Sequence, residues 1–188
     1  MCGRAALTSQ TLEEIADALD AEPVAPALYR PRYNIAPTDQ VWVLTLDQGR
    51  RVLAPATWGL PAPARRPVIN VRSEALGRGA FASLFRETRA LFVCSGFYEW
   101  NADRQPYLFT PSSTSGGFLL LGALLAPRGP AELPATAVLT TRPNDAVAQV
   151  HDRMPVVIPP ADISRWLASP SDEVASLLAP VAATTLQA

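Results

Sequence analysis

Short runs of apolar residues, several of them alternating with polar ones, recur along the chain and predict β-strands. Runs of four to eight residues bounded by turn residues are typical of strands rather than of helices. They fall at residues 40–47, 51–58, 68–71, 90–94, 97–101, 107–110, 118–125, 135–141 and 154–158. The turn sequence Asp47-Gln48-Gly49 separates the first two runs, so we expect these two strands to form a hairpin.

A 3.6-residue periodicity near the amino terminus predicts a helix over residues 10–20. Thr11 followed by Glu14 is a capping-box pattern. The apolar residues of this segment share one helix face: Leu12, Ile15, Ala16 and Leu19. Shorter helices are expected at 73–76, 81–86, 161–168 and 172–178. Many strands and few helices predict an α+β fold, with a curved, mostly antiparallel, barrel-like sheet and a few short flanking helices.

The composition bounds the protein class. With 188 residues, 48% hydrophobic and 18% charged, we expect one domain over residues 1–188 with its own core, and disorder is excluded. No apolar run could span a membrane, and Met1-Cys2 lacks the pattern of a secretion signal, so we expect a cytoplasmic protein without membrane contact. Two cysteines and one histidine cannot form a four-ligand zinc site, and no disulfide, metal or cofactor is expected.

Charge is unevenly distributed although the net charge is only −1. Residues 1–22 carry one Arg and five acids, residues 23–100 carry ten Arg and five acids, and residues 101–188 carry five Arg and seven acids. The net value argues against a nucleic-acid packaging protein. The middle segment could nevertheless bind a phosphate-rich partner, the alternative being that its arginines are solvated surface charges. All sixteen basic residues are Arg, so the only amine available as a nucleophile is the chain terminus.

Cys2 is the position with the most distinctive chemistry. A small residue after the initiator allows methionine aminopeptidase to remove Met1, which places a thiol and an α-amine on one residue. The reference pKa of an α-amine is about 7.7–8.0, far below the roughly 10.4 of Lys, so a nucleophilic fraction exists at neutral pH. Such a 1,2-aminothiol reacts with an aldehyde to form an imine and then a thiazolidine ring. The alternative is an incidental cysteine.

Six short segments extend this interpretation. In chain order they are Met1-Cys2-Gly3-Arg4, residues 32–38 (RYNIAPT), Trp58-Gly59-Leu60, residues 69–74 (INVRSE), residues 96–100 (GFYEW) and residues 151–155 (HDRMP). This series resembles the SRAP family, the "SOS response-associated peptidase" proteins that cross-link to abasic sites in single-stranded DNA. The resemblance runs from residue 2 to about residue 167. Residues 180–188 show no strand or helix pattern, so we expect them to be frayed. Family members usually continue into a further strand and a polar loop, so we expect the C-terminal edge of the sheet to be incomplete.

The resemblance implies a set of catalytic residues. Cys2 matches the nucleophile, and Glu99 matches a carboxylate that shuttles protons while Tyr98 and Trp100 raise its pKa by desolvation. Asn70 matches the residue that orients the sugar. His151 matches an active-site histidine beside the 3′ phosphate that assists proton transfer.

The resemblance also implies DNA contacts. Arginine side chains are expected to bind the phosphates, and an apolar wedge is expected to separate the stacked bases. The candidate DNA-binding residues are Arg4, Asn34, Pro37, Trp58, Arg72 and Arg153. Cys94, on an apolar strand, is interpreted as a buried small hydrophobe.

The implied function is a response to DNA damage. The protein would sense abasic sites in single-stranded DNA and protect them as a covalent thiazolidine cross-link through Cys2, acting as a monomer in the cytoplasm and at the nucleoid when bound to DNA. Two alternatives remain. One is an N-terminal-Cys peptidase or amidotransferase, pairing Cys2 with His151 and including autoproteolytic removal of Met1, although the Asn-Gly segment of such glutaminases is absent. The other is a non-covalent module that binds single-stranded DNA.

Overall fold

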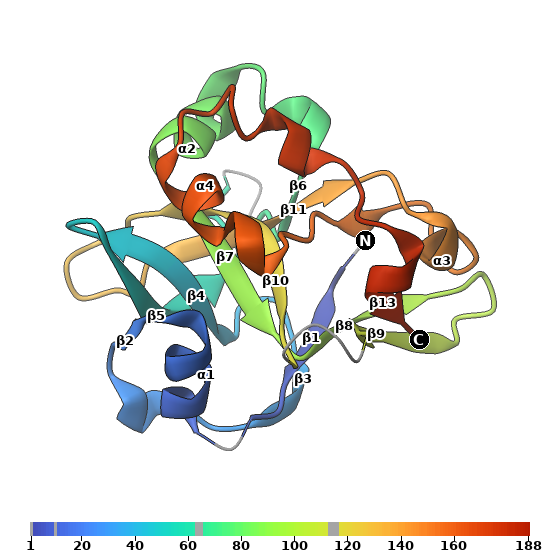
Figure 1. The fold of residues 1–188 in the computed structure, drawn as a ribbon, viewed down its shortest axis with the longest axis horizontal. Helices are drawn as coiled ribbons and strands as arrows, with labels where there is room; N and C mark the ends of the chain where they lie inside the picture. Colours follow the sequence, from blue (N-terminus) through green and yellow to red (C-terminus); the bar gives the residue numbers. More distant parts are fainter. Residues whose placement is uncertain (1, 10, 63–65, 113–116) are drawn as a thin grey trace.

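Five strands close into a ring, which forms the centre of the fold (Figure 1). Their order is β5, β4, β7, β10 and β11, and β11 pairs back onto β5. All contacts around the ring are antiparallel except the parallel contact between β5 and β11. The bounds are β4 Gln40–Asp47, β5 Arg50–Trp58, β7 Arg89–Cys94, β10 Leu119–Ala126 and β11 Ala135–Thr141. The expected barrel-like sheet is therefore confirmed.

The structure is a computed structural model that describes residues 2–9, 11–62, 66–112 and 117–188.

Three short strands extend the ring: β6 and β12 pair with β11, and β2 pairs with β5. Their bounds are β2 Glu22–Pro23, β6 Asn70–Arg72 and β12 Met154–Pro155.

A second sheet has the strand order β13, β9, β8, β1 and β3, and its contacts are antiparallel. Its strands are β1 Arg4–Leu7, β3 Arg32–Ile35, β8 Gly96–Trp100, β9 Pro106–Pro111 and β13 Leu186–Gln187. The chain passes from the ring into this sheet through Ser95, whose backbone N–H donates to Ala6 O at 2.7 Å. Strands β1 and β3, which carry Arg4 and Asn34, were not predicted.

The predicted hairpin of β4 and β5 is confirmed. It closes through a two-residue loop with Asp47 opposite Arg50. Gln48 and Gly49 both have positive φ, 48° and 80°, as a type I′ turn requires. This turn matches the right-handed twist of the strands and fixes their register.

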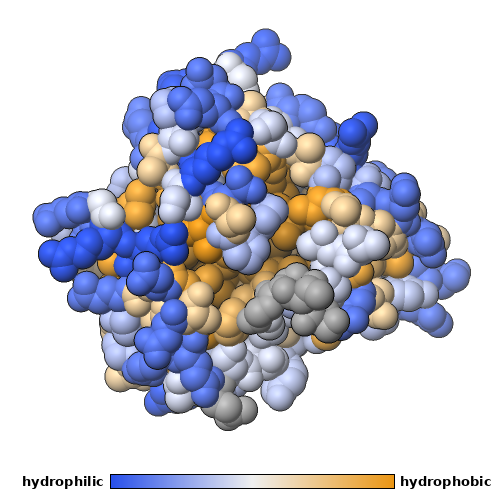
Figure 2. Space-filling view, viewed as in Figure 1, coloured by the Kyte–Doolittle hydropathy of each residue, from blue (hydrophilic) through white to orange (hydrophobic). Residues whose placement is uncertain are grey.

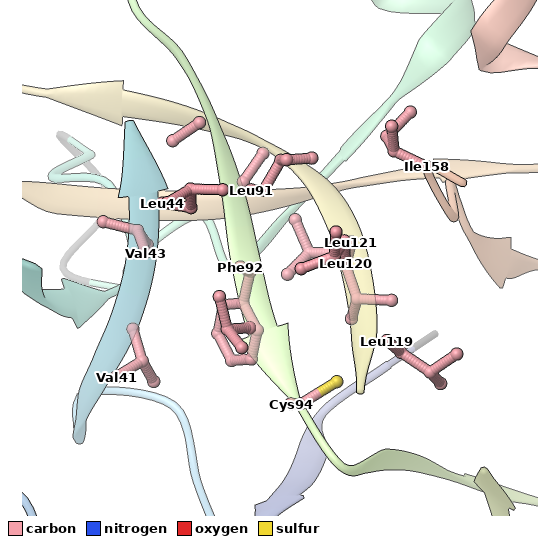
Figure 3. Close-up of a cluster of buried hydrophobic side chains, with 14 of the residues drawn as sticks. Val41, Val43, Leu44, Leu91, Phe92, Cys94, Leu119, Leu120, Leu121 and Ile158 are labelled. Atoms are coloured by element: carbon pink, nitrogen blue, oxygen red, sulfur yellow. The ribbon is translucent and has the colours of Figure 1, made fainter. Parts of the chain in front are cut away.

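The ring is filled by apolar side chains from neighbouring strands (Figure 3). Phe92 of β7 and Leu121 of β10 are fully buried, and Cys94 lies at the end of β7 in the same cluster, as expected for a small hydrophobe. Trp58 is also fully buried, with its ring centroid 5.1 Å from that of Phe92 in an edge-on arrangement. The β-strands of the ring are thus held by continuous apolar packing.

Short helices cover the sheets. Helix α1 (Leu12–Leu19) has the predicted capping box, since Thr11 Oγ1 accepts from Glu14 N at 3.2 Å and Glu14 Oε2 accepts from Thr11 N at 3.4 Å. The other helices are α2 Gly79–Glu87, α3 Asp145–Ala148 and α4 Ile163–Ala168, with 3-10 turns η1 Pro26–Leu28, η2 Ser73–Ala75, η3 Pro160–Asp162, η4 Ala175–Leu178 and η5 Ala183–Thr185. Among the described residues, no helix is both long and apolar enough to cross a membrane.

The carboxyl terminus corrects two predictions. Residues 180–188 are not frayed, because Leu186 is buried and pairs with Pro111 of β9. Strand β13 occupies the edge of the second sheet, so the expectation of an incomplete edge is also wrong (Figure 1). The predicted strand at 154–158 contracts to β12, and the predicted helix at 172–178 is replaced by a turn followed by the 3-10 turn η4.

Candidate active site

Cys2 lies immediately before β1 and is 0% exposed. Its backbone carbonyl accepts a hydrogen bond from Asn70 Nδ2 at 2.7 Å, and its Sγ donates weakly to Arg4 O at 3.8 Å. Asn70 begins β6, which runs parallel to β11 with Asn70 opposite Val138. The structure therefore brings together two predicted site residues that are far apart in the sequence. Asn70 Oδ1 is buried and has no hydrogen-bond partner among the described residues.

Glu99 is 1% exposed because the alternation of β8 turns it towards the interior. Its Oε2 lies 3.9 Å from His151 Nε2, so these two predicted residues are also neighbours. Burial raises the pKa of Glu99, and nearby positive charge, including that of protonated His151, opposes this rise. The predicted cause of the desolvation is wrong: Tyr98 and Trp100 alternate with Glu99 and so point to the other face of the sheet, where they are partly exposed.

Three polar groups surround Nδ1 of His151. Arg153 N donates to it at 3.0 Å. Arg153 O at 3.2 Å and the exposed Asp152 Oδ1 at 3.0 Å are acceptors for a protonated Nδ1. The other ring nitrogen, Nε2, faces Glu99.

The Cys2 thiol is linked electrostatically to the same carboxylate. Burial raises the pKa of Cys2 well above its ordinary value, and the charges of Glu99 and Cys94 add to this rise. The thiol is therefore protonated at neutral pH. A reaction at sulfur needs a group that accepts its proton, and Glu99 is a carboxylate close enough for its charge to act on the thiol.

The three candidate arginines differ in availability. Arg72 is exposed, and its side chain has no hydrogen bond or ion pair within the described part of the chain. Arg4 donates to the neighbouring Gly3 O at 2.8 Å and is partly exposed. Arg153 is only 13% exposed and forms a two-point pair with Glu74, with N···O distances of 2.7 and 2.9 Å. Arg153 is thus already paired within the chain, in contrast to Arg72.

The two residues predicted to form the wedge between bases differ in exposure. Trp58 cannot stack on a base in this structure, because it is 0% exposed and its Nε1 donates to Ile69 O at 3.0 Å within the core. Pro37 is partly exposed in a turn closed by Asp39 N and Ala36 O at 3.1 Å. Thr38 follows with φ 75°, a conformation that is strained for a β-branched residue.

Exposed aromatic surface lies elsewhere. Tyr33 is 72% exposed and Trp100 is 37% exposed. Tyr98 OH donates to Tyr33 O at 3.1 Å and so ties β8 to β3, next to the exposed Asn34. The period of two along residues 96–100 would have assigned Trp100 to the face opposite Glu99, but sequence reasoning grouped the two.

The described residues contain no metal-binding cluster. Figure 2 shows apolar residues at the centre of one face of the molecule, with hydrophilic residues around them. Among the described residues no group of three or more His, Cys, Asp and Glu is arranged to hold a metal ion. Cys2 and Cys94 are both free thiols. The site offers an amide, a carboxylate, an imidazole and a thiol, which together suit proton transfer and covalent chemistry at a carbonyl.

Comparison with known proteins places this geometry in a family. The family model described as "SOS response associated peptidase (SRAP)" matches residues 1–188. The chain is 28% identical over 205 residues to the abasic site processing protein YoqW of Bacillus subtilis, covering 100% of this chain and 91% of that protein. It is 29% identical over 179 residues to the abasic site processing protein YedK of Escherichia coli, covering 89% and 79%.

A solved structure supports the same grouping. The crystal structure of a phage-related protein from Bordetella bronchiseptica superposes with a TM-score of 0.79 at 30% sequence identity, covering 99% of this chain and 92% of that one. The family model spans the segments that hold Cys2, Asn70, Glu99 and His151. The chain belongs to the SRAP family.

Proposed function

We propose that this protein, once Met1 is removed, forms a covalent cross-link with abasic sites in single-stranded DNA through Cys2. Its relatives YoqW and YedK are named abasic site processing proteins. The observation that carries the proposal is the convergence of four separate segments: Asn70 holds the Cys2 carbonyl, Glu99 acts electrostatically on the Cys2 thiol, and His151 faces Glu99. These groups surround a residue that can present both an amine and a thiol.

The proposed reaction has two stages. The Cys2 α-amine attacks the ring-open aldehyde of the abasic sugar, and the resulting carbinolamine loses its hydroxyl as water to form an imine. The thiol sulfur then adds to the imine carbon while the thiol proton passes to the imine nitrogen, closing a thiazolidine. The net reaction joins the aminothiol to the aldehyde and releases one water, so no metal, redox partner or cofactor enters the balance.

Glu99 is proposed to move the protons of both stages. Because burial raises its pKa, a protonated fraction persists towards neutral pH and donates to the departing hydroxyl. The resulting carboxylate then accepts the thiol proton, which the raised pKa of Cys2 would otherwise hold in place. His151 Nε2, 3.9 Å from Glu99, passes protons between this carboxylate and the sugar or solvent.

Substrate positioning is proposed for the polar groups around Cys2. Asn70 Nδ2 fixes the Cys2 backbone, and its buried Oδ1 offers an acceptor to a sugar hydroxyl. Arg72 and Arg4 bind phosphates beside the lesion, while Pro37 and Asn34 contact the strand from the neighbouring loop. The backbone of Trp58 anchors this loop, because Thr38 N donates to Trp58 O at 2.8 Å.

Removal of Met1 is an essential part of the proposal. While Met1 is attached, the Cys2 nitrogen is an amide and has no nucleophilic lone pair. The N-terminal-Cys peptidase alternative is less well supported, because it needs an imidazole aimed at the thiol, whereas His151 Nε2 faces Glu99. We therefore assign the site to cross-linking, by a monomer acting in the cytoplasm and at the nucleoid, where the link shields the lesion during the SOS response.

A denaturing gel tests the proposal directly. Purified protein, with Met1 removal verified by intact mass, is mixed with a single-stranded oligonucleotide that bears one abasic site. We expect a heat-stable shifted band for the wild type, its loss in Cys2→Ala, and its retention in the matched variant Cys94→Ala, which removes the other buried thiol. Cys2→Ala should leave only a hydrolysable imine that borohydride traps. An undiminished heat-stable band in Cys2→Ala would overturn the proposal.

A further inference from the structure

The carboxylate and the histidine of the site belong to different parts of the fold. Glu99 lies in β8 of the second sheet, whereas His151 lies in the segment of residues 142–153 that connects β11 to β12 of the ring, here called the His151 loop. The distance of 3.9 Å between Glu99 Oε2 and His151 Nε2 therefore depends on how this loop is held against the second sheet.

Asn144 fixes the internal structure of the His151 loop. It is 8% exposed and is the N-cap residue of α3, where its Oδ1 accepts from Val147 N at 3.0 Å. Val147 O in turn accepts from His151 N at 2.8 Å. The backbone N–H of Asn144 donates to Met154 Sδ at 3.2 Å, which closes the base of the loop. Asn144 is thus connected through one turn of helix to the backbone of the histidine.

The other half of the Asn144 amide contacts the carboxyl-terminal segment of the chain. Asn144 Nδ2 donates to Val181 O at 3.1 Å and to Ala182 O at 3.4 Å. Residues 181–187 are here called the C-terminal brace. A helix N-cap needs only an oxygen acceptor, which Ser or Asp supplies equally well. The amide adds the donor that holds the brace, so this position uses both ends of an asparagine side chain.

The far end of the C-terminal brace is fixed to the second sheet. Leu186 is buried and pairs with Pro111 of β9, and β9 pairs with β8, where Tyr107 lies opposite Glu99. Figure 1 shows the brace, in red, between α3 and β9. One short segment therefore connects the loop that carries the histidine to the sheet that carries the carboxylate.

We infer that Asn144 is a positioning residue of this site: by holding the His151 loop to the C-terminal brace it keeps His151 beside Glu99. The kinetic consequence of this role rests on the proposed function, in which protons pass between these two side chains. The structural consequence does not, because it concerns only the placement and mobility of His151.

The single histidine gives a readout that needs no DNA, since its Cε1–H resonance is assigned without ambiguity. Asn144→Ser keeps an acceptor for Val147 N but removes the amide donor. We expect the fast motion of the His151 ring, measured by NMR relaxation, to increase in this variant. Thr136→Val is the matched control, because it removes another buried side-chain hydrogen bond, from Thr136 Oγ1 to Leu124 O at 2.9 Å, outside the loop. An unchanged His151 ring in Asn144→Ser, or an equal change in Thr136→Val, overturns the inference.

The contact with Glu99 is tested by a second substitution. Glu99→Gln should shift the His151 resonance in the wild type, because the two side chains are adjacent. In an Asn144→Ser background the same shift should be at least about twofold smaller, since a Coulomb interaction weakens with separation and with entry of solvent. A shift of the same size in both backgrounds would mean that Asn144 does not set this distance.

A variant at the opposite end separates the brace from helix capping. Leu186→Ala weakens the attachment of the brace to β9 and leaves the Asn144 cap intact. We expect it also to mobilise the His151 ring, with circular dichroism confirming that the protein is folded. A folded Leu186→Ala protein with a rigid His151 would reduce Asn144 to a helix cap.

Single-turnover cross-linking gives the kinetic readout. Asn144→Ser should lower the maximal rate about tenfold, while the half-saturating DNA concentration stays within about twofold. In a His151→Ala background the same change should have no further effect, because Asn144 acts through His151. Additive losses of rate would contradict the positioning role.

The two proposals can fail separately. If the wild type forms no adduct but Asn144→Ser still mobilises His151 and weakens its response to Glu99→Gln, the proposed function fails and the positioning role stands. If the wild type cross-links while the His151 resonance and the rate are insensitive to Asn144→Ser, only the positioning role is lost.

Discussion

Two clusters in this fold each bury a charged side chain, and they use it in opposite ways. Arg89, at the start of β7, is 7% exposed and donates to three backbone carbonyls, those of Phe85, Trp166 and Ser169. Glu99, in β8, is 1% exposed and lies among groups that titrate, with His151 Nε2 at 3.9 Å and the Cys2 thiol within electrostatic reach. A charge met by fixed dipoles is suited to holding structure, whereas a charge met by titratable groups is suited to moving protons, the role proposed for Glu99.

Desolvation acts on both groups but has different consequences. Burial lowers the pKa of Arg89, yet a guanidinium starts so high that it stays charged at any physiological pH. Burial raises the pKa of Glu99, which favours the protonated form of a carboxyl relative to an exposed one. The same physical effect therefore leaves the charge of Arg89 in place and favours a neutral Glu99.

We expect the largest difference between the two clusters to be the loss of stability when Arg89 is replaced. Arg89→Met leaves three backbone carbonyls, two of them in buried hydrogen bonds, without this donor, at about 1 kcal/mol each, and should lower the free energy of unfolding by about 3 kcal/mol. For a domain of this size that corresponds to a fall in Tm of about 6–12 °C, measurable by calorimetry. The rate of cross-linking per folded molecule should not change.

An exposed arginine of the adjoining helix provides the control. Arg165 of α4 is 44% exposed and also bonds to backbone, donating to Glu173 O at 2.5 Å. Arg165→Met should cost less than about 1 kcal/mol because its partners stay solvated. Equal losses in the two variants would contradict the role given to burial at Arg89.

The next effect is on the reaction and concerns Glu99. Glu99→Gln keeps the volume but removes the proton carrier, so cross-linking should slow about 100-fold, equivalent to about 2.7 kcal/mol of barrier. DNA affinity should stay nearly intact, and the free energy of unfolding should be unchanged or higher, because a desolvated carboxylate has been removed. Single-turnover gels and urea unfolding measure the two quantities. Parallel losses of rate and stability would make Glu99 a structural residue like Arg89.

The sequence predicted the ring better than the site. Runs such as 40–47 and 51–58 form strands because local patterning and turn chemistry agree, and the Thr11 cap could be identified for the same reason. The candidate site residues were named through the family resemblance, and the structure brings Cys2, Asn70, Glu99 and His151 together.

The features that the sequence did not predict depend on contacts between residues far apart in the chain. The burial of a tryptophan cannot be predicted from a polar sequence motif. Trp58 is buried because it packs against Phe92 in the folded chain. An arginine gives no sign of its partner, so the pair of Arg153 with Glu74, which lies 79 positions earlier in the chain, could not be predicted. The tail at 180–188 became ordered because β9 offers an edge to pair with.

The smallest expected effect is a change of folding stability with pH, and it tests whether Glu99 differs from Arg89. The folded pKa of Glu99 lies above its ordinary value of 4.5, so ionisation costs stability as pH rises from about 4.5 to the folded pKa. Relative to Glu99→Gln, the wild type should lose stability across that window, by about 1.4 kcal/mol for each tenfold difference in proton affinity. The folded pKa of Glu74 is about 2, so its contribution has the opposite sign: it is complete above 4.5 and is lost as pH falls towards 2.

Urea unfolding from pH 3 to pH 8 distinguishes the two carboxylates. The difference between wild type and Glu99→Gln should change above pH 4.5 and be flat below it, whereas that for Glu74→Gln should change below pH 4.5 and be flat above it. Arg89→Met should show a difference from wild type that does not vary with pH, since its guanidinium does not titrate in this range. A Glu99 difference that is flat throughout would mean that the carboxylate is as fully compensated as Arg89, and the contrast between a structural and a reactive buried charge would then be lost.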